Sequence, residues 1–144
     1  MTIRVFFMAL GLLIGMSSFG QSNEDLIRHS IQNYFNGTAY NYLDQIRSAF
    51  HPEAELYLEN GDGELWKITA DEYIALFERS EPGKFSGRYS QILSIEIEGN
   101  LAQVKAEILM PARNRRYIDV FIMRQNKEGK WQIVSKAANS SLIE

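Results

Sequence analysis

The chain has 144 residues, of which 45% are hydrophobic and 23% charged, and its formal net charge is −3. This length suggests one domain, and the mildly acidic charge makes nucleic acids and anionic membrane surfaces poor partners. The chain contains no cysteine, which excludes disulfide bonds and catalysis by a thiol.

The first twenty residues, Met1–Gly20, have the pattern of a secretory signal peptide. Arg4 gives a positively charged start, and Val5–Met16 is an apolar stretch, short for a membrane span. Small residues occupy the −3 and −1 positions of a cleavage site before Gln21. The sequence therefore predicts an exported protein, periplasmic or secreted, that is cleaved after Gly20 and carries no further membrane span. An uncleaved N-terminal anchor is the alternative.

Two helices are expected next, over Glu24–Asn36 and Tyr40–Phe50, because apolar residues recur there at helical spacing. Ser22 is suited to cap the first helix, and Gly37 is expected to end it, since glycine tolerates a left-handed backbone. Pro52 is expected to end the second helix, because the residue before a proline disfavours helical angles.

The rest of the chain is expected to be mostly strands. Alternation predicts a strand over Ala54–Glu59, a turn at Asn60–Gly63 and a short returning strand at Leu65–Ile68. A third helix is expected to begin after Thr69 or Asp71, either of which can act as its cap. Four longer strands then form a predicted meander: Gly87–Glu98, Leu101–Met110, Tyr117–Gln125 and Lys130–Ala138.

Side chains along a strand point alternately to the two faces of the sheet, so the positions of the apolar residues predict which face each one occupies. One apolar row is expected at Leu93, Ile95 and Ile97, and a second runs from Ala102 to Met110 at every other residue. The last two strands are apolar on both faces over part of their length, which predicts that both faces are covered. The helical layer is one cover, and a second subunit is the other, so the sequence predicts a homodimer through the sheet.

Helices followed by an antiparallel meander predict an α+β fold in which the helices pack on a strongly curved sheet and leave a pocket between the layers. One unit is expected over residues 21–144. The sequence shows no metal-ligand spacing, no phosphate-cradling glycine loop and no Ser-His-acid set, so neither metal nor cofactor is expected.

The arrangement resembles the nuclear transport factor 2-like superfamily, also called the SnoaL-like fold. The resemblance is carried by Phe50-His-Pro-Glu-Ala54, Gly63-Glu-Leu65, the helix around Glu72-Tyr73, and Asp119 followed by Glu128-Gly-Lys-Trp-Gln-Ile-Val-Ser-Lys136. It covers about residues 24–142 and is strongest for the subgroup named "putative lumazine-binding". The resemblance implies a cone-shaped α+β barrel with a pocket for a small, mostly apolar molecule.

The superfamily contains isomerases, dehydratases, cyclases and association modules, so the resemblance leaves the function open. Many of its enzyme-like members place a histidine near the end of the last strand. The matching stretch in this chain is Ala137-Ala-Asn139, a departure that weighs against a hydrolase or cyclase.

Two residues are candidates for catalysis. Asp119 alternates with Tyr117 and Phe121 on the row expected to face the pocket, where an unpaired acid is costly. It is either a general base beside a carbonyl or one half of an ion pair with Lys136 or Arg116. His51 is either a base at the pocket rim or a polar cap at a helix end.

The candidate ligand-binding residues are mostly aromatic: Tyr34, Tyr42, Trp66, Tyr73, Tyr117 and, as a polar group, Lys136. Aromatic walls with a few polar groups describe ligand sites, and they equally describe cores. Arg113, Arg115 and Arg116 form a basic turn that either clamps a carboxylate or phosphate or is simply solvated.

Three functions follow from the sequence. The first is an exported domain that binds a small apolar or aromatic molecule. The second is a cofactor-free isomerase or dehydratase that uses Asp119 or His51 as its base. The third is a dimeric association module whose pocket is filled by its own side chains.

Overall fold

The computed structural model describes residues 20–144, so the predicted leader falls, except for Gly20, outside the described residues. The helices are α1 (Asn23–Tyr40), α2 (Leu43–Ala49) and α3 (Ala70–Ala75), with a 3-10 turn, η1 (Pro111–Arg113). The strands are β1 (Phe50–Glu59), β2 (Leu65–Thr69), β3 (Tyr89–Glu98), β4 (Leu101–Met110), β5 (Arg115–Gln125) and β6 (Trp131–Leu142).

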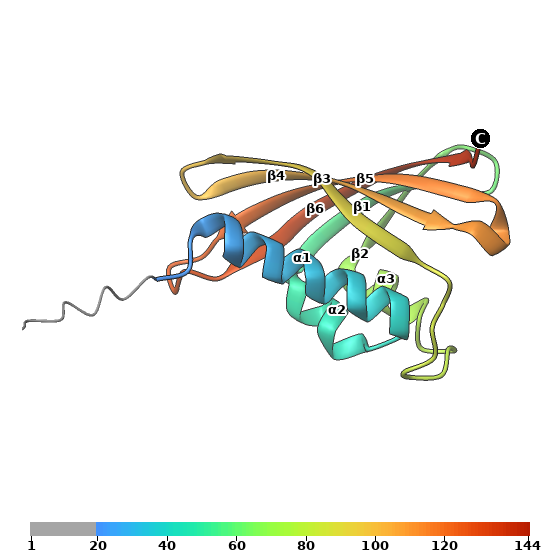
Figure 1. Ribbon diagram of the computed structural model, residues 1–144, viewed down its shortest axis with the longest axis horizontal. Helices are drawn as coiled ribbons and strands as arrows, with labels where there is room; N and C mark the ends of the chain where they lie inside the picture. The colour runs from blue at the N-terminus through green and yellow to red at the C-terminus, as the bar shows by residue number, and fades with distance from the viewer. Residues whose placement is uncertain (1–19) are drawn as a thin grey trace, which may run out of the picture.

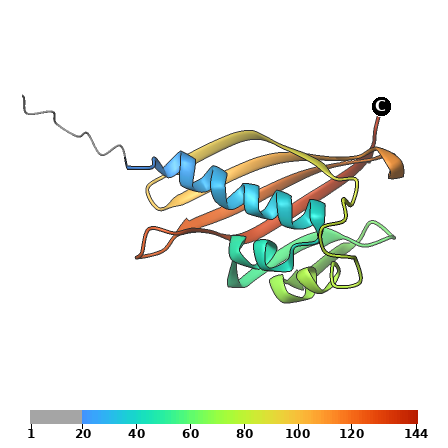
Figure 2. The same ribbon diagram turned by 60° about the horizontal axis from the view of Figure 1, so that its bottom comes forward.

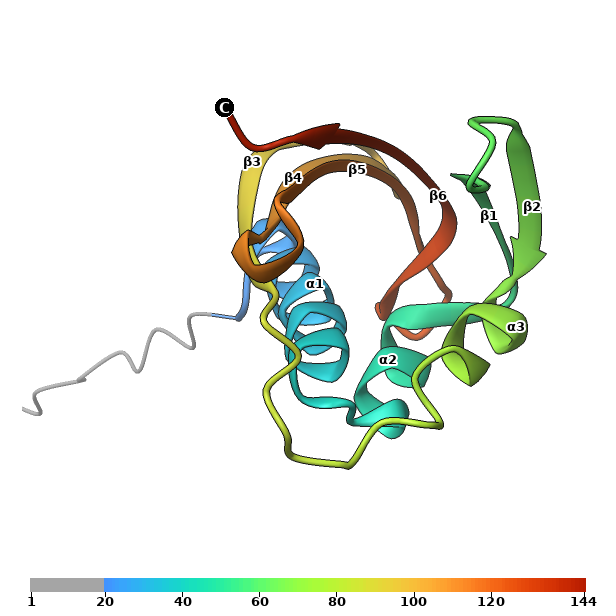
Figure 3. The same ribbon diagram turned by 90° about the vertical axis from the view of Figure 1, so that its right-hand side faces the viewer.

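The strands form one sheet in the order β2-β1-β6-β5-β4-β3. The sheet bends into an arch over the three helices, with β2 at one edge and β3 at the other (Figure 3). α1 runs along the concave side of the sheet, and α2 and α3 follow beside it (Figures 1 and 2). The predicted α+β class, helices on a strongly curved sheet, is confirmed, and the sheet stays open.

All neighbouring strands are antiparallel except β1 and β6, which pair in parallel. This pairing joins the first hairpin to the end of the meander. The sequence did not predict it, because a parallel pairing between distant segments leaves no local signal. None of the helices in the described part of the chain has the length and apolar character needed to cross a membrane.

The first helix is longer than predicted. Ser22 caps it through a capping box with Asp25, as expected, but the helix continues past Gly37 to Tyr40 and ends at Asn41 in a left-handed conformation. Gly37 therefore does not end the helix. A Cβ on Gly37 would lie 2.5 Å from Ile46 Cγ1, so the glycine permits close packing of α2 on α1.

The second helix is shorter than predicted. It spans Leu43–Ala49, and β1 begins directly at Phe50, so Pro52 lies in a strand and does not itself end the helix. The pairing of β1 with β6 is irregular between Phe50 and Glu55. A proline is tolerated there because an irregular stretch does not need its missing N–H group.

The third helix begins after Thr69, the first of the two predicted caps. The Thr69 hydroxyl accepts a hydrogen bond from the N–H of Glu72, and the Glu72 carboxylate accepts one from the N–H of Thr69. These two bonds satisfy backbone donors that a helix start leaves unpaired. The cap places Tyr73 on the buried side of α3.

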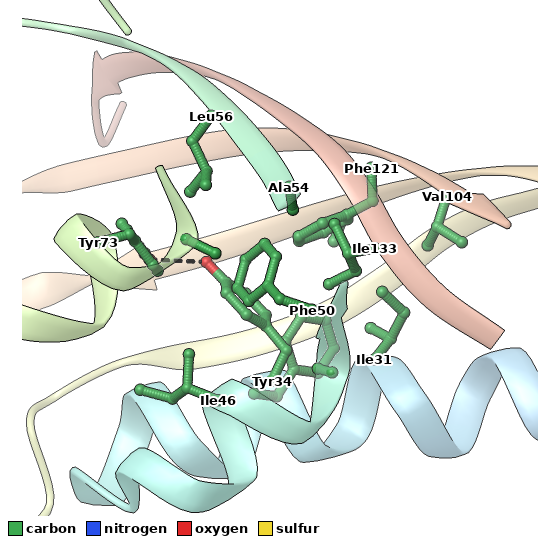
Figure 4. Close-up of a cluster of buried hydrophobic side chains, with 14 of the residues drawn as sticks. Ile31, Tyr34, Ile46, Phe50, Ala54, Leu56, Tyr73, Val104, Phe121 and Ile133 are labelled. Atoms are coloured by element: carbon green, nitrogen blue, oxygen red, sulfur yellow. Dashed lines mark hydrogen bonds between the residues drawn. The ribbon is translucent and has the colours of Figure 1, made fainter. Parts of the chain in front are cut away.

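The core lies between the helices and the concave side of the sheet. Figure 4 shows Tyr34 of α1 among apolar side chains from α2, the sheet and α3. The predicted inward row of β4 is confirmed, since these residues are all buried: Ala102, Val104, Ala106, Ile108 and Met110. Trp131 is buried as well, and its indole N–H donates to Asn23 Oδ1.

The predicted apolar row of β3 is wrong in part. A bulge between Ile92 and Ser94 leaves Leu93 as an extra residue, so the alternation changes phase there. Ile92 and Ile95 pack against the core, whereas Leu93 and Ile97 are exposed.

A second bulge changes the phase of β6. Met123 pairs with Ile133 and Ile122 with Ser135, which leaves Val134 as the extra residue. Strict alternation from Ile133 would turn Ser135 inward. The bulge turns Lys136 inward instead, where its side chain is buried.

Candidate functional site

A cavity of about 360 Å³ lies between β1, β2, α3 and the inner side of β5 and β6. Its lining is mixed, with aromatic, apolar and charged side chains: Leu58, Glu59, Trp66, Tyr73, Leu76, Arg88, Arg113, Tyr117, Asp119, Lys136, Ala138 and Ser140. The volume falls in the lower part of the range for small-molecule sites, roughly 300–1,000 Å³.

A larger depression of about 500 Å³ lies elsewhere, over the start of α2. Its lining comes from Asn41–Gln45 together with Pro82, and it contains no buried ion pair. Small-molecule sites usually combine apolar walls with a few converging polar groups. The 360 Å³ cavity fits this description better and is therefore the candidate site.

The polar floor of the cavity is an ion pair between neighbouring strands. Lys136 Nζ lies 3.1 Å from Asp119 Oδ2, and their side chains are 4% and 3% exposed. The two residues are diagonal neighbours, because Lys136 pairs directly with Phe121 and Asp119 with Ala138. The sequence left Lys136 and Arg116 as possible partners of Asp119. In the structure the partner is Lys136, and Arg116 pairs with Glu107 at 2.6 Å.

Two tyrosines extend this pair into the helical layer. The Tyr34 hydroxyl donates to Asp119 Oδ2 at 3.3 Å, and the Tyr34 and Tyr73 hydroxyls are 2.8 Å apart (Figure 4). Since a phenol has one proton, Tyr73 then donates to Tyr34. Lys136 Nζ also lies over both rings, 5.9 Å from the Tyr34 centroid and 5.3 Å from that of Tyr73.

Burial sets the protonation state of Tyr34. It raises the pKa of the Tyr34 phenol well above its ordinary value of 10.0, and the neighbouring Tyr73 and Asp119 raise it further. The phenol therefore keeps its proton at neutral pH and remains a donor to Asp119.

Arg88 lines the same cavity, and reasoning from the sequence missed it. It lies directly before β3, within the strand predicted over Gly87–Glu98, and an arginine at the start of a strand gives no sign of a binding site. Its guanidinium carbon lies 5.5 Å from the centre of the Phe77 ring. Burial by itself would lower the pKa of Arg88, but the acidic groups of Tyr73, Tyr34 and Asp119 outweigh it and raise that pKa.

The segment before Arg88 is tied to the end of α1. Asn41 Nδ2 donates to the carbonyl oxygens of Glu81 and Lys84, and the Ser86 N–H donates to the Ala39 carbonyl at 2.7 Å. These bonds anchor the 81–86 loop that leads to Arg88. The only local signal in the sequence is the pair of glycines at positions 83 and 87, both of which have positive φ.

Five predicted site residues line the cavity together: Trp66, Tyr73, Tyr117, Asp119 and Lys136. Tyr34 lies behind them, fully buried in the core and joined to them through its hydroxyl. His51 and Tyr42 lie elsewhere. His51 Nδ1 accepts from the Glu53 N–H and borders a small depression over α3, and Tyr42 stacks on Tyr40 at the surface. The roles of all these residues remain predictions.

The three arginines of the basic turn are placed in three different ways. Arg113 lines the cavity at its mouth, Arg116 is paired with Glu107, and Arg115 is exposed outside the cavity. Within residues 20–144 no group of three or more histidine, aspartate or glutamate side chains is placed to hold a metal ion.

Comparison of structures finds many relatives with this fold. An NTF2-like protein of unknown function from Shewanella baltica superposes with a TM-score of 0.73 at 18% identity, over 85% of this chain and 98% of its own. One from Methylobacillus flagellatus gives 0.71 at 24% identity, over 88% and 99%. A "putative ketosteroid isomerase" from Shewanella frigidimarina gives 0.58 at 9% identity, over 82% and 98%. At these identities the likeness shows the fold alone.

Among curated proteins, none matches this sequence significantly. The family model described as "putative lumazine-binding" matches residues 22–138, which is most of the chain. Together with the fold, this match confirms the resemblance that the sequence motifs indicated. The chain belongs to the "putative lumazine-binding" family and has the nuclear transport factor 2-like fold.

Proposed function

We propose that this protein is an exported domain that binds a small molecule in the cavity between its sheet and helices. The observation that carries the proposal is the cavity itself, where apolar and aromatic walls surround a buried, paired set of charges. The name of the family also points to a small-molecule ligand. Export rests on the Met1–Gly20 pattern of the sequence.

The paired state of Asp119 favours binding over chemistry. Lys136 and Tyr34 both contact its Oδ2 atom, so the carboxylate is held in one place and its charge is balanced. A general base must be free to take a proton from the substrate, and removing it from this pair would leave Lys136 buried without a partner. We therefore place an enzymatic role second.

One observation still supports a cofactor-free isomerase or dehydratase. Asp119 borders the cavity, and its second oxygen, Oδ1, accepts no hydrogen bond from any other residue in the 20–144 range. A substrate could therefore approach that oxygen. The test is an assay with a 5-ene-3-ketosteroid, in which an isomerase would shift the double bond. Turnover that is lost in Asp119→Asn would support the enzyme, and the absence of turnover would count against it.

The test of binding is native mass spectrometry of the protein purified gently after export. A stoichiometric small molecule that is released on denaturation would support the proposal and identify the chemical class. Displacement of that molecule in Trp66→Ala, but not in Tyr42→Ala, would locate it in the cavity, since Tyr42 lies outside it. A protein that emerges empty under all gentle conditions would instead favour an association module.

We also propose that the protein forms a homodimer through the sheet. Leu93, Ile97 and Leu101 are exposed on β3 and β4, and Ile122 lies beside Ile97 and Leu101 in a shallow depression. Covering these side chains would remove apolar surface from water. Light scattering after size-exclusion chromatography tests this, and a monomer at every concentration would contradict it.

A further inference from the structure

We infer that the ligand of the cavity carries an anionic group, a carboxylate or a phosphate, and that Arg88 and Arg113 bind this group. The inference rests on the proposed function, because it takes the cavity to be a small-molecule site. It goes further by naming the chemistry of the ligand and the two side chains that recognise it.

The charges that line the cavity do not balance. Lys136 and Asp119 neutralise each other within their ion pair. The remaining charges of the lining are two positive ones, Arg88 and Arg113, and one negative one, Glu59. Glu59 is exposed at the end of β1, where water screens it. The cavity is therefore net positive in a chain whose overall charge is −3, which is the arrangement expected for an anionic ligand.

Arg88 has no carboxylate within 4.0 Å among the described residues, unlike Arg28, Arg47 and Arg116, which all have one. Its guanidinium packs on the Phe77 ring, and the residue lines the cavity together with Tyr73 and Asp119. A half-buried guanidinium without a carboxylate partner keeps its hydrogen-bond donors available. It matches the planar, two-oxygen edge of a carboxylate or phosphate.

Arg113 comes from the turn beside the start of β3, since Tyr89 pairs with Leu109 and the η1 turn begins two residues later at Pro111. It ends the η1 turn between β4 and β5, and Asn114, with φ of 50°, closes that turn. Arg113 is exposed and makes no ion pair within residues 20–144. It can therefore meet a ligand at the mouth, while Arg88 meets it deeper in the cavity.

The rest of the lining defines the body of the ligand. Trp66 and Leu76 border the cavity and are exposed, and Tyr73 presents its ring beside them. Exposed apolar side chains at the mouth of a pocket favour a flat aromatic or apolar body. The combined expectation is a small aromatic acid or aromatic phosphate.

Matched probes test the charge. Isothermal titration of the protein purified after export would compare 2-naphthoate, 2-naphthyl phosphate and the neutral 2-naphthamide. We expect one anion to bind at least about tenfold more tightly than the amide, because a hydrogen bond to a charged group is worth this much in affinity. The tighter of the two anions tells a carboxylate ligand from a phosphate ligand.

Variants test the assignment of the residues. In Arg88→Gln we expect the preference for the anion to disappear while the amide binds as before, and Arg88→Lys should keep part of it. Arg113→Gln should weaken the preference less, because its side chain is exposed. Arg115→Gln on the same turn is the matched control and should change nothing. Thermal unfolding of each variant would confirm that it folds.

The outcomes separate this inference from the proposed function. Equal affinity for the amide and both anions would overturn the anionic ligand and leave the small-molecule site standing. Binding of none of the three probes would overturn the aromatic anionic ligand, and the native mass spectrum would decide separately on the small-molecule site. A preference that survives in the Arg88→Gln, Arg113→Gln double variant would overturn the assignment to these two arginines.

Discussion

Lys136 Nζ lies 3.1 Å from Asp119 Oδ2 in the interior of the fold, beneath the candidate cavity. The two residues face the same side of the sheet because the extra residue Val134 shifts the phase of β6. A buried pair of this kind makes each charge depend on the other, since an isolated charge in an apolar interior is unfavourable.

Because each charge depends on the other, substitutions of Lys136 and Asp119 should have effects on the free energy of unfolding that do not add. Lys136→Met should lower the free energy of unfolding by about 3–5 kcal/mol, because it leaves the Asp119 carboxylate buried and unpaired. The double variant Lys136→Met, Asp119→Asn should recover most of that loss. Urea denaturation of the two single variants and the double variant measures the coupling. Losses that simply add would show that the two charges act independently.

Tyr34→Phe is expected to lower the free energy of unfolding by about 1–3 kcal/mol. The substitution removes the hydroxyl that bridges Tyr73 and Asp119, and it leaves both partners without that hydrogen bond in a buried place. Tyr40→Phe is the matched control, because Tyr40 is exposed. Chemical denaturation compares the two variants. An equal loss of stability in both would argue against a contribution from the hydrogen bonds of the Tyr34 hydroxyl.

Gly37→Ala tests two opposing effects within α1. Alanine favours the helix by about 1 kcal/mol relative to glycine. The added Cβ, however, would meet Ile46 at 2.5 Å and force α2 away, at a cost of about 1–3 kcal/mol. We expect net destabilisation in thermal denaturation. Gly61→Ala, where nothing lies within 4 Å of the new atom, should have little effect. Stabilisation by Gly37→Ala would mean that the two helices separate easily.

Acid should weaken the fold through carboxylates such as Glu107. The hydrogen bond from Arg116, and then that from Gln91, lowers the pKa of Glu107 below its ordinary value of 4.5. Because the folded pKa is the lower one, this stabilisation is complete above 4.5 and is lost as the pH falls through the folded pKa. Urea titrations above and below 4.5 should show a smaller pH dependence for Glu107→Gln than for the parent protein.

Glu98→Gln is the control for that experiment. Glu98 is exposed on β3 and has no ion pair among the residues that the structure describes. The pH dependence of this variant should follow that of the parent protein. A Glu107→Gln variant with an unchanged pH dependence would show that the contact with Arg116 does not persist in solution.

Much of the fold could be predicted from local patterns. The capping box at Ser22, the hairpin turns, the inward row of β4 and the position of Asp119 on an inward row all depend on near neighbours in sequence. Such features are set by backbone hydrogen bonding and by the period of apolar residues, which a short stretch of sequence already contains.

The errors came where distant segments meet. Gly37 looks like a helix end, yet it lies inside α1 because α2 packs against it. Leu93 looks like a core residue, yet a bulge against β4 turns it outward. Both outcomes depend on a partner segment that local periodicity does not describe.

The sequence by itself determined the order of helices and strands, the family, and five of the side chains that border the cavity. Only the tertiary structure decided which charge meets Asp119 and that Arg88 joins the same cavity. The physical reason is that the bulge at Val134 and the docking of the 81–86 loop on α1 set these side-chain directions. Both depend on contacts between segments far apart in the chain.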